Sequence, residues 1–122
     1  MDYAKAVAAV EQYMLGLTEG NLDAIVDLYA QEAQIEDPIG TDLVVGHDAI
    51  RAFYKGALAG IKKAELSGPV RLAANEAAFP FEITIAAGEA PMYMDIIDVF
   101  RFNDEGKVCS MRAFWGQENM RT

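Results

Sequence analysis

The chain has 122 residues, of which 52% are hydrophobic and 24% charged, a composition typical of one globular domain with a sizeable core. Ten basic against nineteen acidic residues give a net charge of −9, which disfavours nucleic acid and anionic membranes as partners. The single cysteine, Cys109, excludes an internal disulfide and fits a cytoplasmic location. The N-terminus lacks the basic start and apolar run of a signal peptide, and no stretch reaches membrane-spanning length. We therefore expect one domain over residues 1–122.

Three helices are predicted in the first half of the chain. Apolar residues recur at three- and four-residue spacing up to Leu17, which predicts an amphipathic helix that Gly20 ends. Asn21 suits the N-cap of a second helix, and Asp48 suits the first turn of a third. The predicted helices run from Asp2 to Leu17, from Leu22 to about Ala30, and from His47 or Asp48 to about Leu58. A short strand, Ala33–Pro38, lies between the second and the third.

After Gly60 the pattern changes to the two-residue alternation of strands. Turn signals separate four predicted strands, Lys63–Ala74, Ala77–Ala86, Pro91–Phe102 and Lys107–Gln117. Three helices followed by an antiparallel meander predict an α+β fold, with the helices covering the concave face of a curved antiparallel sheet.

The stretch Met92–Phe102 places a carboxylic acid among large apolar side chains. With the period of a strand, Asp98 shares a face with Met92, Met94, Ile96, Phe100 and Phe102. An ionised carboxylate in such surroundings is unfavourable unless it is paired, so a raised pKa and a neutral acid are expected. The alternative interpretation is an aspartate near a solvated rim of the sheet.

Tight loops between the last three strands predict their register. If Phe102 faces Lys107, then Asp98 lies opposite Met111, Ile96 opposite Ala113 and Met94 opposite Trp115. If Ala86 faces Pro91, then Phe79 lies beside Asp98. The expected concave wall consists of Phe79, Phe81, Ile83, Met94, Ile96, Asp98, Met111, Ala113 and Trp115. A slip of one residue in either loop would turn these side chains to the other face.

Two further polar residues are candidates for the same wall. Asp37 shares a strand face with Ala33 and Ile35, and Pro38 restricts its backbone to extended conformations. Tyr13 lies on the apolar stripe of the first helix. The alternatives are a turn residue that caps the bend after position 38 and a half-buried tyrosine with its hydroxyl in water.

Other kinds of site have weaker support. His47 is expected to be an exposed residue at a helix start, and Cys109 has no evident histidine partner. No Cys/His cluster has zinc-ligand spacing, and no glycine-rich loop follows a strand as in nucleotide sites. Neither a metal site nor a nucleotide site is therefore expected.

Four segments resemble the bacterial Δ5-3-ketosteroid isomerases over nearly the whole chain. The segments are Val10-Glu-Gln-Tyr13, Ile35-Glu-Asp-Pro-Ile-Gly40, Ile96-Ile-Asp-Val-Phe-Arg-Phe102 and Ser110-Met-Arg-Ala-Phe-Trp115. The resemblance implies a cone-shaped α+β fold, a homodimer packed through its sheets, and a small hydrophobic steroid as substrate. It also implies cofactor-free conversion of a 3-oxo-Δ5-steroid into its conjugated 3-oxo-Δ4 isomer.

The same resemblance implies roles for individual residues. Asp37 would move a proton from C4 to C6, while Tyr13 and a protonated Asp98 would donate hydrogen bonds to the C3 oxygen. Tyr29 and Tyr54 match positions that support the catalytic tyrosine in one branch of the family. The implied substrate-binding residues are Phe53, Phe79, Phe81, Ile96, Met111 and Trp115.

Two alternatives use the same apolar wall. One is a non-catalytic carrier of flat hydrophobic ligands, which gives Asp37 no role. The other is a polyketide-cyclase-like enzyme, since related cone folds also host cyclases, dehydratases and epoxide hydrolases, and the fold alone does not determine the reaction.

Overall fold

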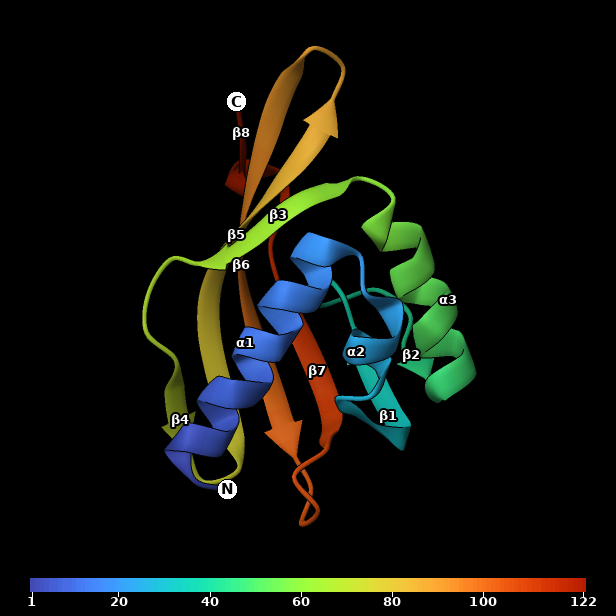
Figure 1. The fold of residues 1–122 in the computed structure, drawn as a ribbon, viewed down its shortest axis with the longest axis vertical. Helices are drawn as coiled ribbons and strands as arrows, with labels where there is room; N and C mark the ends of the chain where they lie inside the picture. Colours follow the sequence, from blue (N-terminus) through green and yellow to red (C-terminus); the bar gives the residue numbers. More distant parts are fainter.

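In the computed structural model, which describes residues 1–122 apart from the side chain of Ala87, three α-helices pack against one face of a curved sheet (Figure 1). Helix α1 (Tyr3–Glu19) starts at Asp2, whose carboxylate accepts from the Lys5 backbone N–H, and ends at Gly20 with φ 67°. A positive φ of that size favours glycine, so the predicted end of the helix is confirmed. Helix α3 (His47–Leu58) also has its predicted bounds.

Helix α2 (Leu22–Val26) is shorter than predicted. Asn21 does cap it, but the apolar residues Tyr29 and Ala30 belong to the first strand rather than to the helix. The prediction was wrong because a buried strand end and a buried helix turn have the same apolar composition over so few residues.

The sheet is mixed rather than a pure antiparallel meander. Its strands are β1 (Tyr29–Glu36), β2 (Val44–Val45), β3 (Ile61–Leu66), β4 (Arg71–Ala73), β5 (Glu76–Ala87), β6 (Ala90–Phe102), β7 (Val108–Phe114) and β8 (Met120–Arg121). The order along the sheet is β2-β1-β7-β6-β5-β3, with β4 paired to β5 and β8 to β6. Strand β1 runs parallel to β7, with Ile35 beside Met111, so the α+β class holds while the connectivity differs from the prediction.

Two predicted strands are interrupted. The segment predicted as one strand over 63–74 is divided into β3 and β4, and Pro69, which cannot donate to a ladder, lies in the break. The last predicted strand stops at Phe114 and continues as a 3-10 turn, Gln117–Asn119, before β8.

The predicted register between β5 and β6 is confirmed. Phe79 pairs with Asp98, Phe81 with Ile96 and Ile83 with Met94, across the short turn at Gly88-Glu89. Direct pairing puts these side chains on one face of the sheet. The wall on this side of Asp98 therefore follows from the sequence.

The predicted register between β6 and β7 is wrong by two residues. Asp98 pairs with Ala113 instead of Met111, and Phe100 pairs with Met111. One residue of the shift comes from the loop, because Phe102 faces Val108 instead of the predicted Lys107. The other residue comes from an irregularity of the ladder between Arg101 and Phe102. Because the two slips add to an even number, the predicted face of each strand is preserved.

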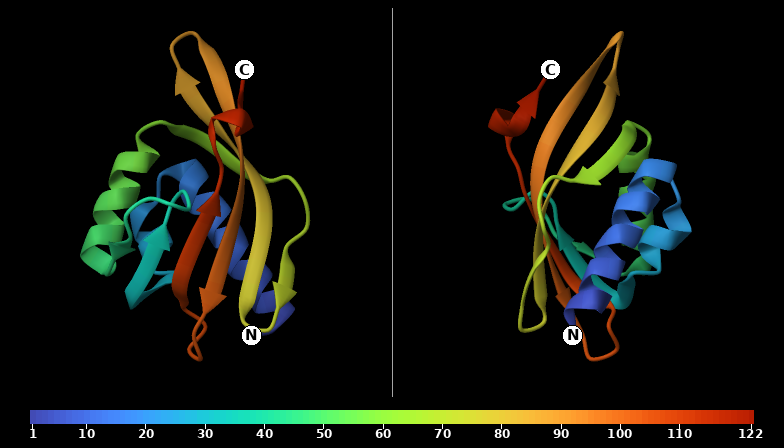
Figure 2. Two further views of the ribbon diagram at one scale, coloured as in Figure 1. Left: turned by 180° about the vertical axis from the view of Figure 1, so that it is seen from behind. Right: turned by 60° about the vertical axis from the view of Figure 1, so that its left-hand side comes forward.

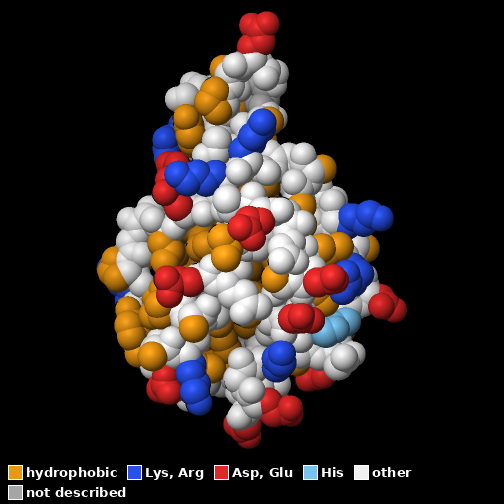
Figure 3. Space-filling model, in the orientation of Figure 1, with side chains coloured by type: hydrophobic (Ala, Val, Ile, Leu, Met, Phe, Trp, Pro, Cys, Tyr) orange, Lys and Arg blue, Asp and Glu red, His pale blue; other side chains and the backbone are white. Residues whose placement is uncertain are grey.

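The helices lie on the concave side of the sheet and enclose the core with it (Figure 2). The largest fully buried aromatic side chains are Tyr29, Tyr54, Phe79, Phe100 and Phe102. Among the described residues, none of the helices combines the length and apolar character that crossing a bilayer requires. The helix-bearing face of the molecule mixes acidic, basic and apolar side chains (Figure 3).

Candidate functional site

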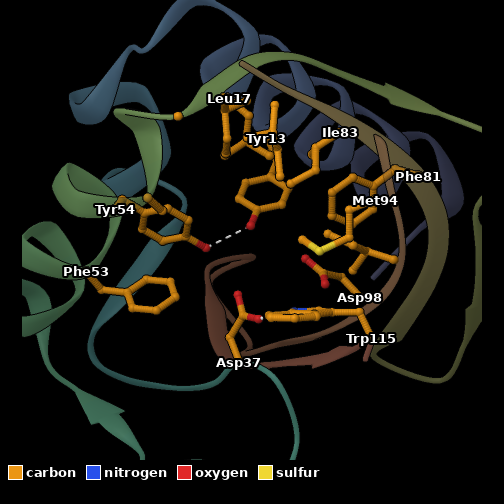
Figure 4. A pocket seen from close by; sticks show the side chains of 15 residues that line it. Tyr13, Leu17, Asp37, Phe53, Tyr54, Phe81, Ile83, Met94, Asp98 and Trp115 are labelled. Carbon is orange, nitrogen blue, oxygen red and sulfur yellow. Dashed lines mark hydrogen bonds between the residues drawn. The ribbon is translucent and has the colours of Figure 1, made fainter. Parts of the chain in front are cut away.

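A cavity of about 290 Å³ lies between the helices and the sheet. Its lining is apolar apart from two carboxyl groups, two tyrosine hydroxyls and one indole N–H (Figure 4). The lining residues are Tyr13, Leu17, Asp37, Phe53, Tyr54, Ala57, Gly60, Ile61, Phe81, Ile83, Ile85, Met94, Ile96, Asp98 and Trp115. An apolar pocket with a few convergent polar groups is the usual form of a small-molecule site.

Asp98 comes to the cavity from the middle of β6. It is 1% exposed and, among the described side chains, is an ionisable group buried in the core, as its strand pattern predicted. Its Oδ1 atom has no hydrogen-bond partner among the described residues. Burial raises the pKa of Asp98 well above its usual value, and the nearby charge of Asp37 raises it further. Both effects favour the protonated, neutral form of the acid over the carboxylate.

Tyr13 is buried on α1, where helical spacing puts it on the stripe with Val10 and Leu17. Its hydroxyl lies 2.9 Å from that of Tyr54 on α3, and the Tyr54 hydroxyl lies 2.6 Å from that of Tyr29 on β1. Three phenols from three elements thus form one hydrogen-bonded row. Burial, chiefly, raises the pKa of all three well above the ordinary value. The alternative of a water-facing Tyr13 hydroxyl is not observed.

Asp37 follows directly after β1, on the face of the buried residues Ala33 and Ile35. Its Oδ1 atom accepts a hydrogen bond of 2.8 Å from the Trp115 indole N–H. The neighbouring Glu36, not Asp37, caps the bend by accepting from the Gly40 backbone N–H at 2.7 Å. Burial raises the pKa of Asp37, and the bond from Trp115 opposes that rise.

The three acidic and phenolic groups face one space. Figure 4 shows the carboxyl groups of Asp37 and Asp98 and the hydroxyl of Tyr13 turned toward the centre of the cavity. They come from positions 13, 37 and 98, which lie on α1, after β1 and on β6. Two carboxyl groups and a phenol between apolar walls are groups that can exchange protons with a bound molecule and donate hydrogen bonds to it.

The cavity differs from the predicted wall in three residues. Phe79, Met111 and Ala113 do not line it; all three are buried in the core. Phe79 lies beside Asp98 and contacts the Tyr13 ring edge-on, and Met111 lies between Phe100 and Ile35. The two-residue alternation of a strand predicts which side chains share a face of the sheet. It does not predict how far along the strand the cavity extends. Phe53, Phe81, Ile96 and Trp115 do line it.

Tyr29 and Tyr54 differ in their relation to the cavity. Tyr54 lines it and bonds to Tyr13, whereas Tyr29 stands one bond further away and does not line it. His47 is half-buried rather than exposed, because its Nε2 atom lies 2.7 Å from the Tyr29 carbonyl oxygen. Among the described residues, no group of three or more His, Cys, Asp or Glu side chains is placed to hold a metal ion.

Several lining residues were not predicted: Leu17, Ala57, Gly60, Ile61 and Ile85. The spacing of a helix and the alternation of a strand could have identified three of them from the sequence. Leu17 and Ala57 each lie four residues after a predicted site residue on a helix, and Ile85 continues the alternation of Phe81 and Ile83. No comparable signal marks Gly60 and Ile61, which reach the cavity through the turn from α3 to β3.

Comparison with known proteins gives the family. Residues 10–111 match the SnoaL-like domain. The chain is 44% identical over 117 residues to "Steroid Delta-isomerase" from Nocardioides simplex, covering 96% of this chain and 94% of that protein. It is 30% identical over 112 residues to "Epoxide hydrolase LasB" from Streptomyces lasalocidi, covering 86% of this chain but only 39% of that protein.

A solved structure has the same fold. The epoxide hydrolase/cyclase-like enzyme SalBIII, described in pyran ring formation in polyether salinomycin, superposes with a TM-score of 0.87 at 28% identity. The match covers 98% of this chain and 96% of that one. The chain therefore belongs to the SnoaL-like domain family and is a homologue of steroid Delta-isomerase.

Proposed function

We propose that this protein isomerises 3-oxo-Δ5-steroids to conjugated 3-oxo-Δ4-steroids by moving one proton from C4 to C6, without a cofactor. The observation that carries the proposal is Asp98: this fully buried acid has an Oδ1 atom without a hydrogen-bond partner among the described residues, and it lines an apolar cavity together with Tyr13 and Asp37. A buried polar group without a partner lowers stability, and a catalytic role is one reason why a protein keeps such a group. The 44% identity to a steroid Delta-isomerase supports the same reaction.

Asp37 is the proposed base. Its carboxylate removes a proton from C4 of the substrate and returns it to C6, so that one group serves both steps. The pKa of Asp37 is raised by burial, which makes its carboxylate a stronger base than an exposed aspartate. The Trp115 indole N–H holds one carboxylate oxygen and leaves the other free to face the substrate.

Tyr13 and Asp98 are the proposed oxyanion donors. When the C4 proton leaves, negative charge develops on the C3 oxygen of the dienolate. Two O–H groups in a dry cavity stabilise that charge more than they stabilise the ground-state ketone, which lowers the barrier. An ionised Asp98 could not donate and would repel the oxyanion, so its raised pKa is a condition of this role.

The hydrogen bonds among the three tyrosine hydroxyls can all run in the direction that this role requires. Each hydroxyl has one proton, so donation from Tyr29 to Tyr54 and from Tyr54 to Tyr13 leaves the Tyr13 proton free for the substrate. Chains of hydrogen bonds polarise one another, so this direction also makes Tyr13 a better donor.

We further propose that the protein acts as a homodimer joined through the outer faces of its sheets. On the outer face Ile97 pairs directly with Phe114, and these side chains are 49% and 43% exposed. An exposed apolar pair in the middle of a sheet favours burial against a partner. A cytoplasmic location stays a prediction.

The test is direct. Addition of a Δ5-3-ketosteroid to the purified chain is expected to produce the ultraviolet band of the conjugated enone, above the rate in buffer. Steroid binding without that band would instead support a non-catalytic carrier. The absence of both binding and turnover would reject the proposed substrate.

A second candidate reaction is the opening of an epoxide by a hydroxyl group or water. It is favoured by the two epoxide-hydrolase relatives and by the two carboxyl groups that share one cavity. Protonated Asp98 would donate to the epoxide oxygen as its C–O bond breaks, while Asp37 takes the proton of the attacking oxygen. Incubation with an apolar epoxide, followed by mass spectrometry of the product, separates the two reactions.

A further inference from the structure

Two carboxylates face each other on the outer surface of the sheet, behind the cavity. Glu82 on β5 pairs directly with Asp95 on β6. Like charges directly opposite each other destabilise a pair of strands. The next pairs along the same ladder, Phe81 with Ile96 and Ile83 with Met94, have their side chains in the cavity. The unfavourable pair is therefore placed directly behind the wall of the site.

Arg121, near the C-terminus, bridges these two carboxylates. Its Nε and Nη2 atoms donate to the two oxygens of Asp95 at 3.1 Å each, and Nη2 also donates to Glu82. Its guanidinium group lies over the Tyr93 ring, 5.2 Å from the centroid. These contacts lower the pKa of Asp95 and raise that of Arg121. A bidentate pair within a network, with a stacked guanidinium, is stronger than a single exposed ion pair.

The bridge closes a loop that begins with Trp115. Phe114 pairs with Ile97 and Met120 pairs with Met94, so residues 115–119 lie opposite only positions 95 and 96 of β6. Because this segment has more residues than the part of β6 opposite it, the chain between Phe114 and Met120 leaves the sheet and forms a loop. Gly116 and Asn119 close this excursion with two hydrogen bonds, from the Gly116 N–H to Asn119 Oδ1 and from the Asn119 N–H to the Gly116 oxygen.

Trp115, the first residue of the excursion, has a direct contact with the proposed base. It lines the cavity and donates its indole N–H to Asp37. Pairing of β8 with β6 holds the far end of this excursion on the sheet, and a segment held at both ends samples far fewer conformations than one held at a single end. The position of the indole thus depends on the far end of the excursion.

We propose that Arg121 is a positioning residue for the proposed isomerase site. By joining Glu82 and Asp95 it holds β8 on the sheet, closes the 115–119 loop and keeps the Trp115 indole on Asp37. The expected effect of Arg121 on kinetics rests on the proposed function, whereas its expected effect on the position of Trp115 does not. Among the described residues, the titratable groups that share the cavity with Asp37 are Asp98 from β6, Tyr13 from α1 and Tyr54 from α3.

The first measurement uses the single tryptophan as a reporter and needs no turnover. In Arg121→Gln, Trp115 fluorescence is expected to shift to longer wavelength and to be quenched more strongly by acrylamide than in the parent chain. Arg51→Gln is the matched control, because Arg51 pairs with Asp23 at 2.8 Å on the helical side, away from the excursion. Glu82→Gln, which leaves Arg121 only Asp95, is expected to give a smaller shift in the same direction.

The second measurement is the pH dependence of kcat/KM. Loss of the indole bond removes a donor from the Asp37 carboxylate, so the acid limb of the profile should move to higher pH in Arg121→Gln. A displacement of about 0.5 pH unit corresponds to about a threefold loss of kcat/KM on that limb. In a Trp115→Phe background the Arg121→Gln change should displace the limb no further, because the bond is already absent. Arg121→Lys, which cannot form the bidentate contact, should restore the profile only in part.

The outcomes separate this inference from the proposed function. Unchanged acrylamide quenching and an unchanged acid limb in Arg121→Gln would overturn the positioning role. So would an equal displacement of the acid limb by Arg121→Gln in the parent chain and in the Trp115→Phe background. An inactive parent chain would reject the isomerase proposal, while the fluorescence comparison would still decide the inference.

Discussion

Asp98 couples the stability of the protein to pH. Burial raises its pKa in the folded state, whereas in the unfolded chain its pKa is about 3.9. A group with a raised folded pKa contributes its full stability below the unfolded pKa, and that contribution is lost as pH rises toward the folded pKa. The acid that serves the proposed site therefore lowers the stability of the fold at neutral pH.

Asp98→Asn is expected to remove this loss. The variant's free energy of unfolding relative to the parent chain should rise between pH 4 and pH 8, by about 1–3 kcal/mol, because the amide does not titrate. Urea denaturation at several pH values measures the difference. Asp95→Asn on the same strand is the control, because Arg121 lowers the pKa of Asp95 and its effect on stability should have the opposite sign. The Asp95→Asn variant should be less stable than the parent chain at neutral pH, and this difference should disappear in acid. A pH-independent difference for Asp98→Asn would contradict the buried neutral acid.

Asp37→Asn is expected to keep binding and to lose turnover. The amide still accepts from the Trp115 indole but cannot take a proton, so kcat should fall by about 10²–10⁴-fold with little change in the affinity for a steroid. Steady-state kinetics and equilibrium binding measure the two effects. Glu36→Gln is the matched control, because Glu36 caps the Gly40 N–H and lies outside the cavity. Equal losses in the two variants would remove Asp37 as the base.

The phenol row predicts a graded series. Tyr54→Phe removes the hydroxyl that contacts Tyr13, so kcat should fall by about five- to tenfold. Tyr29→Phe, one bond further away, should cause a smaller loss. Tyr3→Phe on the exposed start of α1 should leave kcat unchanged. A larger loss in Tyr29→Phe than in Tyr54→Phe would reverse the proposed order of the row.

At the scale of elements, the position of α1 decides where the Tyr13 hydroxyl lies. Gly16 lets α1 approach α2 closely, since a Cβ atom there would come within 2.7 Å of Ile25 Cγ1. The backbone N–H of Ala64 on β3 donates to the Thr18 hydroxyl at 2.9 Å and ties the other side of the helix to the sheet. The helix that presents the phenol is thus held by contacts on two sides.

Two glycine-to-alanine changes should have opposite signs. Gly16→Ala overpacks the α1–α2 contact and should lower the free energy of unfolding by about 1–3 kcal/mol. Gly56→Ala, in the exposed middle of α3 with no heavy atom within 4 Å of the added Cβ, should raise it by about 0.5–1 kcal/mol through higher helix propensity. Thermal or urea unfolding compares them. A stabilising Gly16→Ala would show that the helices can separate freely.

The whole molecule is expected to associate through its outer sheet face. Sedimentation should give a mass of twice the 13.3 kDa chain, and Phe114→Asp should give a single chain because it puts a charge into an apolar contact. Leu15→Asp changes a side chain of similar exposure, 57%, on the helical side and should leave the dimer intact. Dissociation by Leu15→Asp but not by Phe114→Asp would move the interface to the helices.

The sequence alone determined the local features. Periodicity predicted α1 and α3, alternation put Asp98 among apolar side chains, and the short turn at Gly88 led to the observed pairing of β5 with β6. These features follow from neighbours within a few residues. The motifs around Tyr13, Asp37 and Asp98 also indicated the family, because their order and spacing along the chain are specific.

Only the tertiary structure decided what depends on distant contacts. The parallel pairing of β1 with β7 and the two-residue shift beside Arg101 arise where segments far apart in the chain meet. The exclusion of Phe79, Met111 and Ala113 from the cavity, the bond from Trp115 to Asp37, and the Arg121 bridge have the same origin. A strand pattern gives the side on which a residue lies, but the shape of a cavity depends on how all the surrounding elements pack.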